Sequence, residues 1–599
     1  MTLQSVGPPR TTAAHRVNFR FSGRAGWAAC LVADGNTAPH VETWSLRGTT
    51  PEAQPLPTTH GETVRSQPMP AEDGRVLLVR NGPGAHEVVV VGRDEPGGVP
   101  EHRVARFDSP ALRAVPSIDP ATLGWLVAYH SAGHCVLHRV DARTLRVDPV
   151  VQVPGRLTGE GWLSERGDLL AANQLTAGGH HPVTVDLRRG TVSALDAPGS
   201  AVVLTSPRRN RVLVATRLPD GLRLGWAALD GTPVRYPAAL NAITGTALPL
   251  AVDPTGRRLA VRVTDGAASR LLVHDDDTDQ IAEVPVPPGV IRSAGWGESG
   301  LRLLWSSPTC PTTVATLPAS PGPDGWPPPS PGSGTVGADR GAGWQDARTE
   351  HFDGPDGRVE AVVYGDWRRA RHLLVALHGG PEAAWELAFD PFFQSLAAAG
   401  VAVVAPNQRG STGYGAAYRD AINGAWGGPD LADIRWLRAR LDRERRTVAG
   451  PAPMLFGTSY GAFLALLAAA ADPYGWSRCA VVAPFLSGPL LHRDGSPAVR
   501  SLIDRLGGTT PIDDELGPRD LLRLAPRIRA RLLVVHGRRD DVIPVAHSRA
   551  LARRLAETSI AERFRYREVA DGGHNPLDDA GGRTLRAEII DFFTAERPG

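Results

Sequence analysis

The first half of the chain repeats a pair of apolar, alternating segments at intervals of about 45 residues. Two clear copies are Arg257–Val263, which follows the turn Asp253–Gly256, and Leu301–Trp305, which follows Gly297–Gly300. Evenly spaced strand pairs with Asp, Arg and Gly turns are typical of a β-propeller, and a pair of β-sandwiches is the alternative. Seven such pairs predict seven blades: Trp27–Ala33, Gly74–Val91, Leu123–Val140, Gly161–Val185, Val202–Ala228, Ala251–Val273 and Val290–Ser306.

The repeat ends at a segment rich in proline, glycine and serine, residues 319–343. Six prolines between positions 321 and 331 exclude a helix or the interior of a sheet there, so this segment is expected to be a linker or crossover. The chain has 599 residues, more than one hydrophobic core usually serves. We therefore predict two domains, a propeller at 1–335 and a second domain at 344–599.

After the linker the pattern changes to short apolar strands that alternate with amphipathic helices. This alternation predicts an α/β domain with a doubly wound, mostly parallel sheet. The expected strands are Leu373–Leu377, Val401–Val404, Met454–Phe456, Cys479–Val482, Leu532–Val535 and Phe564–Val569. The expected helices are Pro391–Ala399, Leu431–Arg445, Ala462–Ala470, Ala546–Thr558 and Arg583–Phe593.

Composition excludes several classes of function. The formal net charge is only +2 and no long basic run occurs, which argues against nucleic acid as a partner. All 65 basic residues are arginine, so a lysine Schiff base or a Ser-Lys dyad is excluded. The four cysteines are far apart and favour reduced thiols over disulfides or zinc. No segment is apolar enough for a signal peptide or a membrane helix, which indicates a cytoplasmic protein without a membrane partner.

One short motif gives the strongest indication of function in the sequence. Ser459 lies in Gly457-Thr458-Ser459-Tyr460-Gly461, between a predicted buried strand and a predicted helix of small and aliphatic residues. In a nucleophile elbow the turn from strand to helix is so tight that only glycine fits beside the serine, whose hydroxyl then projects clear of the sheet. The context therefore predicts Ser459 as a nucleophile.

A serine nucleophile needs a base and an acid, which in hydrolases follow it in the order acid, then histidine. Asp540 comes after the strand Leu532–Val535, and His574 comes after Phe564–Val569. Both positions are at carboxyl ends of strands, where such sheets build their sites. We therefore predict Asp540 as the acid and His574 as the base. Asp541 competes for the role of the acid, and His536 and His547 compete for that of the base. We expect His536 to pack in the turn at the end of its strand, His547 to begin the next helix, and Asp571 to shape the glycine turn that presents His574.

The developing oxyanion needs backbone donors. The N–H of Tyr460, next to the nucleophile, is one candidate. The second is expected on the loop after Leu373–Leu377, where His378-Gly379-Gly380-Pro381 offers paired glycines that let the backbone approach a substrate oxygen.

Four motifs together resemble the prolyl oligopeptidase family, and within it the acylaminoacyl-peptidase branch. The motifs are His378–Pro381, Asn407–Gly415, Gly457–Gly461, and His536–Asp540 with Ile543, Pro544 and Ser548. The resemblance implies a triad of Ser459, Asp540 and His574, with the amides of Gly380 and Tyr460 as the oxyanion hole. It also implies a propeller that caps the hydrolase domain and admits only short peptides.

The resemblance to the acylaminoacyl-peptidase branch rests on two features of other branches that this sequence lacks. Prolyl endopeptidases carry an arginine shortly after the catalytic aspartate, but none follows Asp540 closely here. Dipeptidyl-peptidases carry a pair of glutamates in the propeller, and this propeller has no clear pair of that kind. Residues 499–503 resemble the helix that lines the specificity pocket of that branch, so Val499 and Leu502 are candidate pocket residues, with ordinary helix packing as the alternative.

The sequence therefore predicts a serine peptidase acting on short peptides or acyl-peptides without metal or organic cofactor. Because the elbow does not distinguish amides from esters, an esterase or thioesterase with the same triad remains an alternative. A propeller scaffold with an inactive hydrolase domain is a second one. Members of this family often assemble, so a homo-oligomer is also left open.

Overall fold

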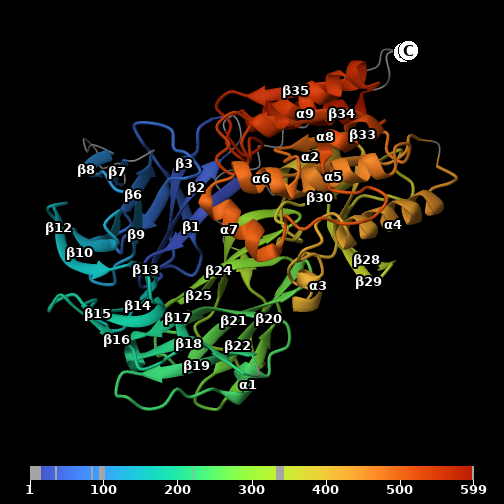
Figure 1. The fold of residues 1–599 in the computed structure, drawn as a ribbon. Coiled ribbons are helices and arrows are strands. Elements are labelled where there is room, and N and C mark those ends of the chain that lie inside the picture. The colour runs from blue at the N-terminus through green and yellow to red at the C-terminus, as the bar shows by residue number, and fades with distance from the viewer. Residues whose placement is uncertain are drawn as a thin grey trace, which may run out of the picture.

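The computed structural model describes residues 15–33, 37–82, 85–92, 101–219, 221–331, 343–448, 450–579 and 581–595. Two bodies are visible in Figure 1: a ring of sheets from the first half of the chain, blue to green, and a helix-covered sheet from the second half, yellow to red. Residues 332–342 lie outside the described residues, and they include nearly all of the predicted division between 335 and 344. The boundary itself therefore stays a prediction.

Seven small antiparallel sheets form the ring, which confirms the predicted seven-bladed propeller. Blades one to four contain β1 (His15–Phe21), β2 (Trp27–Ala33), β3 (His40–Ser45) and β4 (Glu52–Leu56); β5 (Gln67–Pro70), β6 (Val76–Asn81), β7 (His86–Val91) and β8 (Glu101–Phe107); β9 (Ala111–Val115), β10 (Thr122–His130), β11 (His134–Asp141) and β12 (Val147–Pro154); and β13 (Arg156–Trp162), β14 (Leu169–Thr176), β15 (Gly179–Asp186) and β16 (Thr191–Ala194).

Within the described residues, blade five has three strands and the other six blades have four. Blades five to seven contain β17 (Ser200–Ser206), η1 (Pro207–Arg209), β18 (Arg211–Leu218) and β19 (Gly221–Ala228), followed by α1 (Ala238–Asn241); β20 (Thr246–Val252), β21 (Arg258–Asp265), β22 (Ala268–Asp275) and β23 (Gln280–Val284); and β24 (Val290–Gly297), β25 (Gly300–Ser307), β26 (Cys310–Leu317) and β27 (Ser330–Pro331).

Side chains, rather than a shared strand, close the ring in the described part of the chain. Each blade consists of strands consecutive in sequence, so blade one and blade seven meet only face to face. Their common core includes Trp44 and Leu304. The buried guanidinium of Arg302 in blade seven donates hydrogen bonds to the carbonyl oxygens of Leu46 (3.0 Å) and Gly48 (2.6 Å) beside blade one.

The second body is built on an eight-stranded sheet with the order β28-β29-β31-β30-β32-β33-β34-β35. From β31 to β35 in this order neighbouring strands are parallel, as predicted. The bounds are β28 (Ala347–Gly354), β29 (Gly357–Tyr364), β30 (His372–Leu377), β31 (Val401–Asn407), β32 (Met454–Thr458), β33 (Arg478–Val482), β34 (Arg531–Gly537) and β35 (Phe564–Val569).

The antiparallel hairpin β28–β29 at one edge was not expected from the sequence. β28 reads Ala-Arg-Thr-Glu-His-Phe-Asp-Gly and has only two buried residues, Ala347 and Phe352. An edge strand of this kind lacks the apolar run by which buried parallel strands are recognised. β29 pairs antiparallel with β31 and so joins this hairpin to the parallel part.

Helices cover both faces of this sheet and divide its core in two. One face packs against α4, α5, α8 and α9, and the other against α2 and α10. The bounds are α2 (Pro391–Ala398), α3 (Ala416–Asp420), α4 (Pro429–Glu444), α5 (Tyr460–Ala471), α6 (Gly488–Asp494), α7 (Pro497–Leu506), α8 (Leu521–Leu524), η2 (Ala525–Arg527), α9 (Ala546–Ala556), η3 (Ala561–Arg563) and α10 (Gly582–Thr594). The five predicted helices occur within a few residues of their expected bounds, whereas the short helices α3, α6 and α8 were missed.

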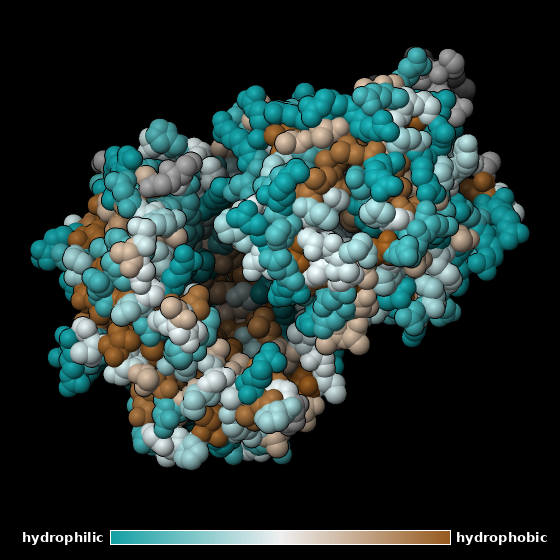
Figure 2. All heavy atoms as spheres, viewed as in Figure 1, coloured by the Kyte–Doolittle hydropathy of each residue, from teal (hydrophilic) through white to brown (hydrophobic). Residues whose placement is uncertain are grey.

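The two bodies are joined firmly on the side of blades six and seven. Ala267, in the turn between β21 and β22, belongs to the core of the hydrolase body, and its N–H donates to Glu360 (2.8 Å). The amide of Gln394 in α2 donates to the carbonyl of Pro308 (2.7 Å). Figure 2 shows a deep hollow between the two lobes.

Candidate active site

Ser459 lies in the turn between β32 and α5 with φ 55° and ψ −118°, a conformation that is strained for a non-glycine residue. The flanking glycines allow this turn. A Cβ at Gly457 would lie 2.2 Å from the carbonyl oxygen of Gly461, and one at Gly461 would lie 2.3 Å from that of Leu377. The crossing of strand and helix therefore accepts only glycine at both positions, which is the geometry of a nucleophile elbow.

The structure brings His574 and Asp540 to this serine from two other loops. His574 Nε2 lies 3.1 Å from Ser459 Oγ, and His574 Nδ1 lies 2.8 Å from Asp540 Oδ2. All three residues follow the carboxyl ends of parallel strands of one sheet, β32, β34 and β35, with β33 between the first two. A histidine held between a hydroxyl and a carboxylate can accept the hydroxyl proton as a general base, while the carboxylate orients the ring and stabilises its charged form.

Asp540 is held by four donors. Its Oδ1 accepts hydrogen bonds from the backbone N–H groups of Val542 (2.8 Å) and Ile543 (2.9 Å). Burial by itself would raise the pKa of Asp540, but hydrogen bonds from His536 and His574 outweigh it and hold that pKa well below its usual range. The carboxylate therefore stays ionised beside the imidazole.

His536 is fully buried behind Asp540 rather than at Ser459. Its Nε2 lies 3.2 Å from Asp540 Oδ2 and 2.9 Å from the carbonyl oxygen of Ile543, while its Nδ1 lies 2.7 Å from Ser548 Oγ. It thus supports the loop that presents Asp540, in agreement with the strand-end packing expected for it.

The other residues weighed near these positions contact other groups. Asp541 is exposed and forms an ion pair with Arg65 of the propeller (2.8 Å). Asp571 pairs with Arg539 on the surface (2.8 Å). His547 is buried near Leu486, whose N–H donates to its Nδ1 (3.2 Å), and burial lowers the pKa of this histidine to about 4.

The glycine loop after β30 lies directly beside Ser459. A Cβ on Gly379 would lie 3.4 Å from Ser459 Cβ, and Gly380 has φ 120°, which favours glycine. His378 anchors the loop, with its Nε2 2.8 Å from Ser411 Oγ, and burial lowers its pKa to about 4, so the ring is neutral. Tyr460 is the first residue of α5, where an N–H has no partner within the helix. The amides of Gly380 and Tyr460 are thus both near Ser459, and their role as oxyanion donors stays a prediction.

The predicted pocket residues Val499 and Leu502 lie in α7. Both are half-buried and pack against the core that surrounds α5. Whether they touch a substrate stays a prediction, with helix packing as the alternative.

Two carboxylates near the site were not identified from the sequence. Asp579 accepts a hydrogen bond from the N–H of Gly573 (2.8 Å) and so shapes the loop that presents His574. Asp430, at the start of α4, is completely buried and accepts a hydrogen bond from the hydroxyl of Tyr460 (2.7 Å). The sequence carries no local signal for either, because their partners are distant in the chain or lie in irregular loops.

A doubly wound sheet with a nucleophile elbow and a serine, histidine and aspartate in sequence order Ser, Asp, His defines the α/β-hydrolase class. Residues 387–596 match the model of the prolyl oligopeptidase family, Peptidase_S9. The chain therefore carries a domain of that family, as the motifs suggested.

One curated relative is an uncharacterized peptidase, YuxL, of Bacillus subtilis. It is 28% identical over 226 residues, which are 37% of this chain and 34% of the relative. The match thus spans about a third of the relative's length.

Two solved structures match over nearly the whole chain. An acylaminoacyl peptidase of Pyrococcus horikoshii has a TM-score of 0.74 at 14% identity and covers 97% of this chain and 96% of its own. A puromycin-hydrolyzing peptidase of Mycobacterium tuberculosis has a TM-score of 0.72 at 17% identity and covers 98% and 96%. At such low identity these similarities show a shared propeller and hydrolase fold.

Proposed function

We propose that this protein is a serine peptidase that hydrolyses short peptides or acyl-peptides through an acyl-enzyme on Ser459. The observation that carries the proposal is the position of His574, 3.1 Å from the serine oxygen and 2.8 Å from the Asp540 carboxylate. The prolyl oligopeptidase family domain supports a peptide as substrate.

In the proposed reaction, Ser459 Oγ attacks the carbonyl carbon of the scissile amide while His574 Nε2 takes the hydroxyl proton. The negative charge that develops on the carbonyl oxygen is stabilised by the N–H groups of Tyr460 and Gly380. The C–N bond then breaks as His574 returns the proton to the leaving amine. Water, deprotonated by the same histidine, attacks the ester carbonyl and releases the acid and free Ser459.

The preference for short peptides rests on the position of the propeller. Arg65 pairs with Asp541, the neighbour of the proposed acid, so blade two lies against the loop that carries Asp540. Beside it is a cavity of about 700 Å³ lined by polar and apolar residues of blades one, two and seven, among them Asn18, Arg65 and Phe21. We therefore expect the propeller to limit the size of the substrates that reach Ser459.

We also propose a cytoplasmic location. Cys30, Cys135, Cys310 and Cys479 are free thiols and the first two and the last are buried, which suits a reducing compartment. Among the described residues, none of the helices combines the length and hydrophobicity that a bilayer crossing requires. Assembly into a homo-oligomer stays a prediction.

The test uses matched acyl-alanyl and acyl-leucyl substrates, each as an anilide and as an ester, with the full chain and its Ser459→Ala variant. A peptidase cleaves the anilides, and Ser459→Ala loses that activity. Negligible anilide cleavage with rapid ester cleavage would assign an esterase instead. Failure of a fluorophosphonate probe to label Ser459 would indicate a scaffold without hydrolase activity.

A further inference from the structure

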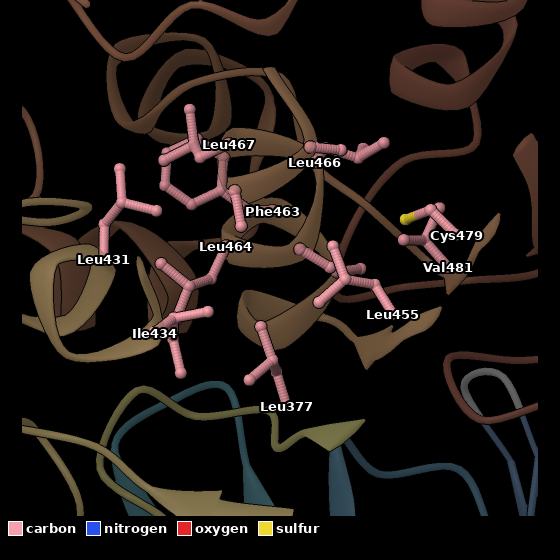
Figure 3. Close-up of a cluster of buried hydrophobic side chains, with 14 of the residues drawn as sticks. Leu377, Leu431, Ile434, Leu455, Phe463, Leu464, Leu466, Leu467, Cys479 and Val481 are labelled. Carbon is pink, nitrogen blue, oxygen red and sulfur yellow. The ribbon is translucent and has the colours of Figure 1, made fainter. Parts of the chain in front are cut away.

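Helix α5, which begins at the nucleophile elbow, is enclosed on all sides. Every residue from Tyr460 to Ala471 is buried. Figure 3 shows Phe463, Leu464, Leu466 and Leu467 of this helix among side chains of α4 and of the sheet. Six alanines and a glycine make up seven of the 12 residues of α5. Such small side chains fix the rotation of a helix about its axis poorly, because they interdigitate little with their neighbours.

Tyr460 carries the only polar side-chain atom in α5. Its hydroxyl donates a hydrogen bond to Asp430 Oδ2 (2.7 Å), and Asp430 Oδ1 accepts the N–H of Leu431 (2.9 Å) at the start of α4. The ring of Tyr460 also packs edge-to-face on Trp426, with 5.2 Å between ring centroids. A single polar contact thus ties the first residue of α5 to the neighbouring helix.

A carboxyl group at position 430 is unfavourable for stability, because it is buried. It is fully buried, and in the described part of the chain no cation pairs with it, whereas the neighbouring Asp433 binds Arg409 (2.7 Å). Burial raises the pKa of Asp430 to about 6, although the hydrogen bond from Tyr460 works in the opposite direction. An apolar side chain would pack at this position without that cost.

We propose that Asp430 is a positioning residue that acts through Tyr460, by holding the Tyr460 backbone N–H in the direction needed to stabilise the oxyanion. The inference rests on the proposed function, because it concerns the same site. The N–H and the phenol ring share one Cα, so anchoring the phenol limits rotation of the amide. Donors of this kind act only over a narrow range of distance, about 2.7–3.1 Å.

The test compares Tyr460→Phe, which removes the hydroxyl, with Asp430→Ala, which removes the acceptor, and Asp430→Asn, which keeps an acceptor oxygen. We expect Tyr460→Phe and Asp430→Ala to lower kcat about 10-fold with little change in KM. This is less than the loss of about 10²–10³ in kcat that removal of a whole oxyanion donor causes. Asp430→Asn should recover most of the activity. Affinity for a peptide boronate, whose oxygen occupies the oxyanion position, should fall by the same factor as kcat/KM.

The matched control is Tyr566→Phe, which removes another hydrogen bond from a tyrosine hydroxyl to a carboxylate (Tyr566 to Glu568, 2.9 Å) in β35. It should leave kcat and the boronate affinity unchanged. The rate at which a fluorophosphonate labels Ser459 gives a readout that needs no knowledge of the natural substrate, since charge develops on the phosphoryl oxygen in the same place.

Equal labelling rates and equal boronate affinities for the wild type and Tyr460→Phe would overturn the inference and leave the proposed function intact. A lower melting temperature with unchanged kcat would likewise assign Asp430 a purely structural role. A wild-type protein whose Ser459 is not labelled at all would overturn the proposed function, and the inference with it.

Discussion

The propeller and the candidate active site of the hydrolase body use polar side chains in different ways. In the propeller, charges neutralise one another: Arg80 binds Glu62 and Glu101 (both 2.7 Å), and Arg211 binds Asp276 (2.6 Å). In the hydrolase body, a serine hydroxyl is instead held in a strained turn beside a histidine. Paired charges stabilise the fold, whereas a serine hydroxyl beside a histidine is suited to the nucleophilic role proposed for it.

The contacts between the bodies show the same contrast on a smaller scale. Ala267 is buried in the hydrolase core on the side of blade six. On the side of blade two, the contact nearest the proposed acid is the exposed pair of Arg65 and Asp541, whose side chains are 59% and 58% exposed. One side is joined by apolar burial, which is hard to disrupt, and the other by a weak, solvent-screened ion pair.

Ser459→Ala should have the largest effect and separate chemistry from stability. We expect kcat to fall by about 10⁶, as when a triad serine is removed elsewhere, with the melting temperature unchanged or slightly raised because the hydroxyl is not needed for packing. Steady-state kinetics and thermal unfolding measure the two. Retention of more than a small fraction of the activity would rule out Ser459 as the nucleophile.

Asp540→Asn should come next. The amide can no longer hold the productive tautomer of His574, so we expect kcat to fall by about 10⁴. Single-turnover labelling with a fluorophosphonate measures the loss directly. The control is Asp541→Asn, which alters only the exposed neighbour; if the two variants lost activity equally, the assignment of the acid would be wrong.

Trp44→Ala should lower stability and leave activity nearly unchanged, the reverse of what we expect for Ser459→Ala. Trp44 is fully buried between blades one and seven, and its truncation should cost about 3–5 kcal/mol of stability. Activity per folded molecule should stay near that of the wild type. Calorimetry measures the stability, and active-site titration gives the activity per folded molecule. A lower kcat per titrated active site would show that the contact between blades one and seven influences the active site.

Asp430→Asn should change how stability depends on pH. The folded pKa of Asp430 is about 6, above the usual value of 3.8. Between these values the folded state binds more protons than the unfolded state, so this group's contribution to stability falls as pH rises through that window, by roughly 3 kcal/mol. Denaturant unfolding at pH 4 and pH 7 should show a smaller decrease for Asp430→Asn than for the wild type. An identical pH dependence would mean that Asp430 is not the buried acid described.

Arg65→Ala should have the smallest effect. Because both partners are exposed, we expect less than about 1 kcal/mol of stability to be lost, and the difference from wild type should vanish at high salt. Melting curves at low and high ionic strength measure this, with Arg75→Ala, which breaks an ion pair within blade two, as control. A large effect would mean that this side of the interface is as firmly joined as the side of blade six.

Local patterns explain which expectations could be made from the sequence. The seven blades and the alternation of strands and helices are periodic within a few residues, so they can be recognised without knowing any distant contact. The hairpin β28–β29 escaped notice since its first strand is polar and lies at an edge. The boundary between the domains and the roles of Val499 and Leu502 stay predictions.

The sequence by itself determined the seven-bladed ring, the parallel sheet and the candidate order of Ser459, Asp540 and His574, because each depends on a local pattern of residues. Only the tertiary structure decided that Ala267 enters the core of the other body and that Tyr460 is tied to Asp430. These pairings join residues 30 or more positions apart, and no periodicity encodes them. They arise because burial of polar groups forces each one to find a partner wherever the fold places it.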